Sequence, residues 1–98
     1  IPLEITVEAA ATSVVTRVAS ATSNHLLVAA NVNRKGLLLY NDGNATQYVK
    51  LGTVATLTDF TVPLTPRMFY EVSAPIYLGQ IDVISSSTNG AIQVTELS

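Results

Sequence analysis

The chain has 98 residues, a size that fits one domain with a single hydrophobic core. Five basic and seven acidic residues give a net charge of −2, the opposite sign from the basic surface of a nucleic-acid-binding protein. Cysteine is absent, which excludes disulfides and thiolate metal sites. Only 12% of the residues are charged while 48% are hydrophobic. This composition predicts that another chain covers part of the apolar surface.

Residues 1–8 read IPLEITVE and alternate between apolar and polar side chains. In a strand, successive side chains point to opposite faces. One face would therefore hold Ile1, Leu3, Ile5 and Val7, and the other Glu4, Thr6 and Glu8. The small residues that follow predict a linker, so we interpret residues 1–11 as an arm with its linker. A lone strand exposes unpaired backbone groups, and we expect its apolar face to bind a neighbouring chain.

Residues 12–98 are predicted to form a single β-domain. Valine, isoleucine and threonine, which favour strands, make up 30 of the 98 residues. Short apolar or alternating runs separated by turn residues follow one another in the order SVVTRVAS, HLLVAAN, LLLY, QYVKL, FTVPL, MFYEV, QIDVIS and AIQVTEL. This pattern predicts an all-β protein, an antiparallel β-sandwich that is jelly-roll-like, with the N-terminal arm as an additional strand.

The alternation also predicts which side chains form the core. The expected core residues are Val14, Val18, Leu26, Val28, Leu37, Leu39, Val49, Leu51, Phe60, Val62, Tyr70, Ile81, Val83, Ile92 and Val94. The turn NDGN between LLLY and QYVKL is predicted to close a hairpin, because Asp-Gly tolerates the positive φ that tight turns need. The stretch LGTVATLTD is expected to be a loop that crosses between the sheets.

No residue pattern indicates catalysis or metal binding. His25 is the only histidine, and we interpret it as an exposed or hydrogen-bonding residue. Asp42, Gly43 and Asn44 lack the distal glutamate of a calcium-binding loop and are predicted to form a turn. The carboxylates are scattered over different runs, and the six aromatic rings lie mostly in apolar alternation, which favours core packing over a sugar-binding platform. We therefore expect no enzyme activity, no catalytic residue, no cofactor and no metal.

Arg34 and Lys35 stand immediately before the LLLY run. Two basic residues are too few for a phosphate-binding patch. Three alternatives stay open for them: they contact a partner, they order the loop, or they are simply solvated. Together with Ile1, Leu3, Ile5 and Val7, they are the candidate partner-binding residues.

Residues 33–98 resemble a module of small virion proteins of tailed bacteriophages. The resemblance rests on the order and spacing of short motifs: Arg34-Lys35-Gly36-Leu37, Tyr40-Asn41-Asp42, Tyr48-Val49-Lys50-Leu51-Gly52, Asp59-Phe60-Thr61-Val62, Tyr70-Glu71, Ala74-Pro75, Tyr77, Gly79 with Ile81-Asp82, Asn89-Gly90, and Val94-Thr95-Glu96-Leu97. It implies a β-sandwich located on the surface of the phage head, as a decoration (cement) protein that binds and stabilises the major capsid protein lattice.

The same resemblance implies a homo-oligomer, with a trimer as the expected symmetry, and neither a nucleic acid nor a membrane as partner. An alternative is a tail or fibre component that acts as a receptor- or glycan-binding module.

Overall fold

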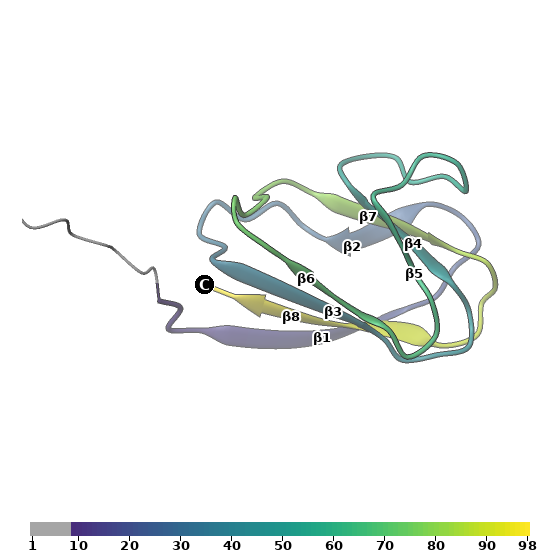
Figure 1. Cartoon of the computed structure of the whole chain (residues 1–98), viewed down its shortest axis with the longest axis horizontal. Helices are drawn as coiled ribbons and strands as arrows, with labels where there is room; N and C mark the ends of the chain where they lie inside the picture. The colour runs from purple at the N-terminus through teal and green to yellow at the C-terminus, as the bar shows by residue number, and fades with distance from the viewer. Residues whose placement is uncertain (1–8) are drawn as a thin grey trace, which may run out of the picture.

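The computed structural model describes residues 9–98, and the predicted arm strand at residues 1–8 lies outside the described residues. The described chain forms two four-stranded sheets that face each other (Figure 1). The strands are β1 (Ser13–Ala19), β2 (His25–Val28), β3 (Gly36–Asn41), β4 (Gln47–Leu51), β5 (Val62–Leu64), β6 (Phe69–Val72), β7 (Ile81–Ser85) and β8 (Ala91–Leu97). Residues 9–98 include no helix that could span a lipid bilayer.

The strand order is that of a jelly roll. One sheet, here called sheet A, has the order β1-β8-β3-β6, and the other, sheet B, has the order β2-β7-β4-β5. All pairs are antiparallel. The pairs β1 with β8, β2 with β7, β3 with β6 and β4 with β5 describe one long two-stranded ribbon that is wrapped into two sheets. The predicted antiparallel, jelly-roll-like β-sandwich is confirmed.

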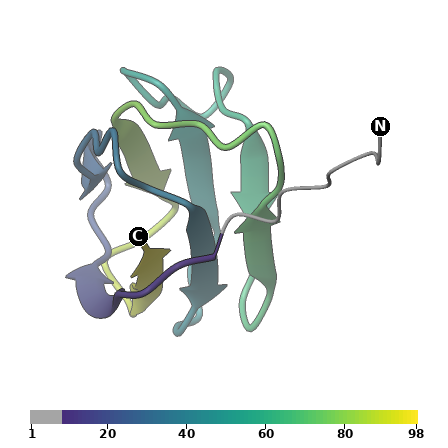
Figure 2. The ribbon, with the colours of Figure 1, turned by 90° about the vertical axis from the view of Figure 1, so that its left-hand side faces the viewer.

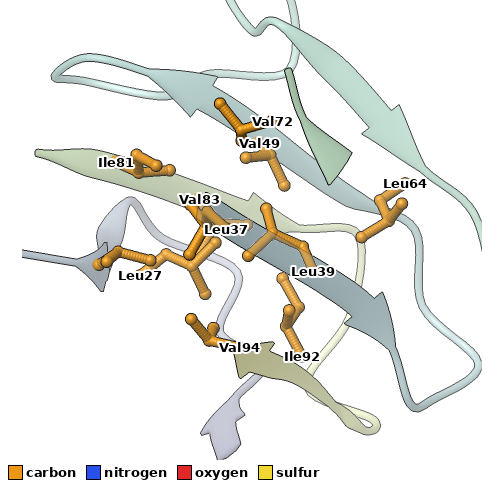
Figure 3. Close-up of a cluster of buried hydrophobic side chains, with 11 residues drawn as sticks. Leu27, Leu37, Leu39, Val49, Leu64, Val72, Ile81, Val83, Ile92 and Val94 are labelled. Carbon is orange, nitrogen blue, oxygen red and sulfur yellow. The ribbon is translucent and has the colours of Figure 1, made fainter. Parts of the chain in front are cut away.

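The core lies between the two sheets, where the inward side chains of each meet (Figure 3). Leu37 and Leu39 of β3 occupy the centre of sheet A, and Val49 and Val83 occupy the centre of sheet B, each at most 1% exposed. Full burial of such a side chain contributes about 1.5–3 kcal/mol, so this layer is the main stabilising feature of the domain.

Most of the predicted core is confirmed. Val28, Leu37, Leu39, Val49, Ile81, Val83, Ile92 and Val94 are buried, while Val18, Leu51, Val62 and Tyr70 pack against them. Three residues of the buried hydrophobic core cluster are not in the predicted set: Leu27, Leu64 and Val72. Phe60 is half-buried and packs edge-on against Tyr48, with ring centroids 4.9 Å apart.

Two predicted core residues are wrong: Leu26 is 51% exposed and Val14 is 52% exposed. The register between β2 and β7 shifts between Leu26 and Val28, so simple alternation fails within β2 and its inward positions are Leu27 and Val28. Val14 is the second residue of β1, an edge strand of seven residues, whereas the edge strand β2 at the same side of the sandwich has only four (Figure 2). The inner face of the first half of β1 is therefore not covered by sheet B.

Both loop predictions must also be corrected. β3 and β4 belong to different sheets, so the NDGN turn does not close a hairpin but crosses from one sheet to the other. The stretch LGTVATLTD, expected to cross between sheets, instead belongs to the connection that joins β4 to β5 within sheet B. The physical reason is that turn chemistry permits a sharp reversal but does not choose the strand that follows as the pairing partner, which here is set by the wrapped ribbon.

The side chain of Asn41 stabilises the loop that follows β3 and crosses from one sheet to the other. This side chain is fully buried, and Nδ2 donates hydrogen bonds to the carbonyl oxygens of Ala45 at 2.7 Å and Leu64 at 2.8 Å. The first bond closes the loop on itself, and the second ties it to β5. The polar residue at the end of an apolar strand thus fixes the connection between the sheets.

Candidate interaction surface

Residues 9–98 enclose no pocket, and no three His, Cys, Asp or Glu side chains among them gather as a metal site. The ring Nδ1 of His25 lies 3.0 Å from the carbonyl oxygen of Ser23. The features of the described chain that stand out for function are an apolar sheet face and an open strand edge.

The solvent-facing side of sheet A carries an apolar patch, here called the outer patch and made of Val15, Leu38, Tyr40 and Phe69. Residues opposite one another in adjacent antiparallel strands share a face. Leu38 lies opposite Thr95, which in turn lies opposite Val15. Tyr40 lies opposite Phe69, and Phe69 and Val15 are 68% and 63% exposed. Leu38, Tyr40 and Phe69 therefore adjoin one another on β3 and β6, and Val15 lies on the same face of the sheet, beyond Thr95 of β8.

A charged cluster lies beside the outer patch. Asp42 accepts a hydrogen bond from Gln93 Nε2 at 3.2 Å and pairs with Arg17 Nε at 3.3 Å and Arg67 Nη1 at 3.5 Å. The hydrogen bond from Gln93, followed by that from Arg17, lowers the pKa of Asp42 from its ordinary value of 3.8. An apolar centre beside polar, charged side chains is the usual arrangement of a protein interface.

The second feature is the outer edge of β1. Each sheet has two edge strands, and three of the four are short: β2 and β6 have four residues each, and β5 has three, one of them Pro63. β1 has seven residues, no proline and a single charge. Within the described part of the chain, β1 pairs only with β8, so its other side is an open edge. A long open edge is a template for strand addition.

Arg34 is inside the domain, which argues against a role in partner binding. Its side chain is 0% exposed, and Nε lies 2.7 Å from Glu96 Oε2. Nη1 donates to the carbonyl oxygens of Tyr77 at 2.6 Å and Gly79 at 3.2 Å, and Nη2 donates to that of Ala29 at 2.7 Å. The guanidinium thus orders the loop before β3, the second of the roles considered, and offers no surface to another chain in this conformation.

Lys35 holds the segment that leads into β1. Its Nζ donates to the carbonyl oxygen of Ala9 at 3.0 Å, and its backbone N–H donates to Leu97 at 2.7 Å. The structure therefore places Lys35 next to the end of the predicted arm. The arm residues themselves, Ile1, Leu3, Ile5 and Val7, lie outside the described residues, so their partner role stays a prediction.

Sequence reasoning named the arm but missed the outer patch. In the run MFYEV, alternation places Phe69 and Glu71 on the face opposite Tyr70 and Val72, which is the signal for an exposed Phe69. The LLLY run gave no such signal, because apolar residues on both faces of a central strand look the same whether the outer face is covered or bare. Aromatic rings are therefore exposed here where core packing was expected.

Comparisons with protein-family models, with curated proteins and with solved structures find no match to this chain.

Proposed function

We propose that this protein is a structural component of a tailed-bacteriophage particle, a decoration (cement) protein that binds the outside of the head and stabilises the major capsid protein lattice. The observation that carries the proposal is the outer patch of sheet A, which exposes Val15, Leu38, Tyr40 and Phe69 on a domain that already has a complete core. The resemblance of residues 33–98 to small phage virion proteins supports the particular setting.

The outer patch supplies what a lattice-binding protein needs. Its apolar side chains gain free energy when another surface removes them from water, and the adjacent Arg17, Asp42 and Arg67 offer charged groups that restrict the orientation of docking. Val15, Leu38, Tyr40 and Phe69 lie in strands, so little backbone order has to be gained on binding. In this proposal the partners are the major capsid protein and further copies of the chain, with a trimer as the expected assembly.

A second candidate is a receptor- or glycan-binding module on a tail or fibre. Tyr40 and Phe69 are directly opposite each other in β3 and β6, and both rings are exposed. Neighbouring exposed rings can stack on the faces of sugars, so this pair favours a glycan as the alternative ligand.

The number of copies per particle tests the proposal. Particles of the phage whose genome encodes this chain are purified, heads and tails are separated, and the chain is quantified in each fraction by stained gel and mass spectrometry. A decoration protein should accompany heads in hundreds of copies. A few copies in the tail fraction would support the second candidate, and absence from both fractions would rule out both.

A further inference from the structure

We propose that residues 1–8 of one copy add as a strand to the open edge of β1 in a second copy. The occupant of this edge is therefore the arm of another chain. Such self-association requires no phage component, so it would hold whatever surface the outer patch binds.

The open edge of β1 is exposed on both faces as well as along its backbone. Val15 on the outer face is 63% exposed and Val14 on the inner face is 52% exposed. Thr16 is also exposed, and Val18 is only half-buried. An added strand would pair with the free backbone groups of β1, and its inward side chains would cover Val14 and Val18.

The arm has the length and pattern that this edge requires. Eight arm residues face a strand of seven, and the polar side of the arm carries Glu4 and Glu8. The single charge of β1 is Arg17, on the outer face. An antiparallel alignment that sets Glu4 opposite Arg17 brings opposite charges together on that face.

The same alignment puts every odd-numbered arm residue on the inner face. Val7 comes opposite Val14, and Leu3 comes opposite Val18, where each covers an exposed or half-buried valine. Pro2 comes opposite Ala19, the last residue of β1, where a missing N–H disturbs the ladder least. A single register therefore pairs the opposite charges, covers the two valines and places the proline at the end of the ladder.

The path of residues 9–12 points to a second copy rather than to the same chain. The N–H groups of Ala11 and Thr12 donate to the carbonyl oxygen of Ser98 at 2.9 and 2.8 Å, and the N–H of Ser98 donates to that of Thr12 at 2.9 Å. Ala9 is held by Lys35, just before β3. This segment therefore crosses the end of β8 toward β3, away from the open edge of β1 (Figure 2). Folding back onto its own β1 would break these contacts.

Each copy would donate one arm and accept one, so the exchange closes without leaving an open β1 edge. The smallest closed assembly is a dimer, and a larger ring uses the same contact. The sparse surface charge of the chain fits an assembly in which this apolar edge is covered.

Engineered cysteines give a direct test, because the chain has none of its own. The proposed register sets residue 7 opposite residue 14, within reach of a disulfide after small adjustment. A Val7→Cys chain and a Val14→Cys chain are mixed, oxidised mildly and run on a non-reducing gel. We expect a covalent species of two chains. The control mixes Thr6→Cys with Val14→Cys, which places the thiols on opposite faces and should give much less product.

The double variant, Val7→Cys with Val14→Cys in one chain, separates exchange from folding back. A covalent dimer or ring supports exchange, whereas a cross-linked monomer shows that the arm returns to its own β1 and overturns the proposal. Equal crosslinking by the control pair, or none by either, also overturns it.

Charge reversal tests the register independently of crosslinking. Arg17→Glu should shift the oligomer toward monomer in sedimentation velocity, because residue 17 would then repel Glu4. Adding Glu4→Arg to Arg17→Glu should restore the oligomer. Because Arg17 also contacts Asp42, only the rescue identifies Glu4 as its partner. An oligomer that neither variant alters, or one that the second change does not restore, would exclude this register.

Discussion

Arg34 Nε lies 2.7 Å from Glu96 Oε2, and the arginine side chain of this pair is completely buried. Its other donors bind the carbonyl oxygens of Ala29, Tyr77 and Gly79. One guanidinium therefore links the loop before β3, the loop before β7 and the strand β8. A buried charge is tolerated only when its hydrogen bonds are satisfied, and here each nitrogen has an acceptor.

Removing this side chain should be costly. We expect Arg34→Ala to lower the free energy of unfolding by about 3–5 kcal/mol, because it leaves three carbonyl oxygens and the Glu96 carboxylate without their donor. Arg34→Lys should recover only part of the loss, since an ammonium group lacks the planar fork. Urea denaturation measures both. The control is Arg67→Ala, whose side chain is 59% exposed and whose pair with Asp42 should contribute about 0–1 kcal/mol. Equal losses for Arg34 and Arg67 would contradict this account.

The role of Arg34 also shows where sequence reasoning fails. Alternation identifies the inward face of a strand within a few residues, and so Val49, Val83 and Val94 are assigned correctly. Arg34 lies in the polar loop NVNRKG, where no periodicity indicates burial. Its partner, Glu96, is 62 residues away in β8. The contact exists only because the wrapped ribbon brings β8 beside β3, and that wrapping is not encoded in any local pattern.

The contact between the loop after β3 and the loop after β7 is likewise not encoded in any local pattern. The turn residues of NDGN (41–44) and of SSTNG (86–90) predict two reversals of the chain, but not that the two turns are in contact. In the structure a Cβ at Gly43 would come within 2.6 Å of the Cα of Gly90, because the two crossing loops pack backbone to backbone. The outer patch was missed for a similar reason, since exposure depends on what covers a face rather than on the residues that form it.

This close approach predicts that both positions require glycine. Gly43→Ala should lower the free energy of unfolding by about 1–3 kcal/mol, because the added methyl group meets backbone that cannot move freely. Gly90→Ala should cost at least as much, since Gly90 also has a φ of +97°. The control is Gly36→Ala, where the nearest atom is the flexible side-chain end of Leu97 at 3.1 Å. Thermal denaturation compares the three variants, and a larger loss at Gly36 would be inconsistent with the packing of the loops.

The same Leu→Ala substitution should destabilise the fold by different amounts at a buried and at an exposed position. Leu39→Ala should lower the free energy of unfolding by about 2–5 kcal/mol, because Leu39 is 0% exposed at the centre of the core. Leu26→Ala removes the same atoms from a side chain that is 51% exposed, and should cost about 0.5 kcal/mol or less. Urea denaturation measures both, and a loss below about 1 kcal/mol for Leu39→Ala would place it outside the core.

The lowered pKa of Asp42 predicts that the stability of the fold depends on pH. Because its pKa is lowered in the folded chain by the hydrogen bonds from Gln93 and Arg17, the carboxylate stabilises the fold fully above its ordinary pKa of 3.8. That contribution is lost as the pH falls through the lower folded-state pKa. The melting temperature of Asp42→Asn should therefore lie furthest below that of the unmodified chain near neutral pH, and the gap should narrow below pH 3.8. Gln93→Ala should reproduce part of the gap, and a gap that widens in acid would contradict the assignment.

The outer patch predicts a loss of binding without a loss of folding. Phe69→Ser should change the free energy of unfolding by about 0.5 kcal/mol or less, because the ring is 68% exposed. If the outer patch binds the capsid lattice, the same change should weaken binding of the protein to purified heads by about tenfold or more, as expected for an aromatic side chain at the centre of an interface. Leu26→Ser is the matched control, since Leu26 is also exposed but lies in β2 of sheet B. Cosedimentation with heads measures both variants. If Leu26→Ser weakens binding and Phe69→Ser does not, the contact with the head lies on sheet B and not on the outer patch. If Phe69→Ser abolishes glycan binding but not head binding, the tail or fibre role is favoured.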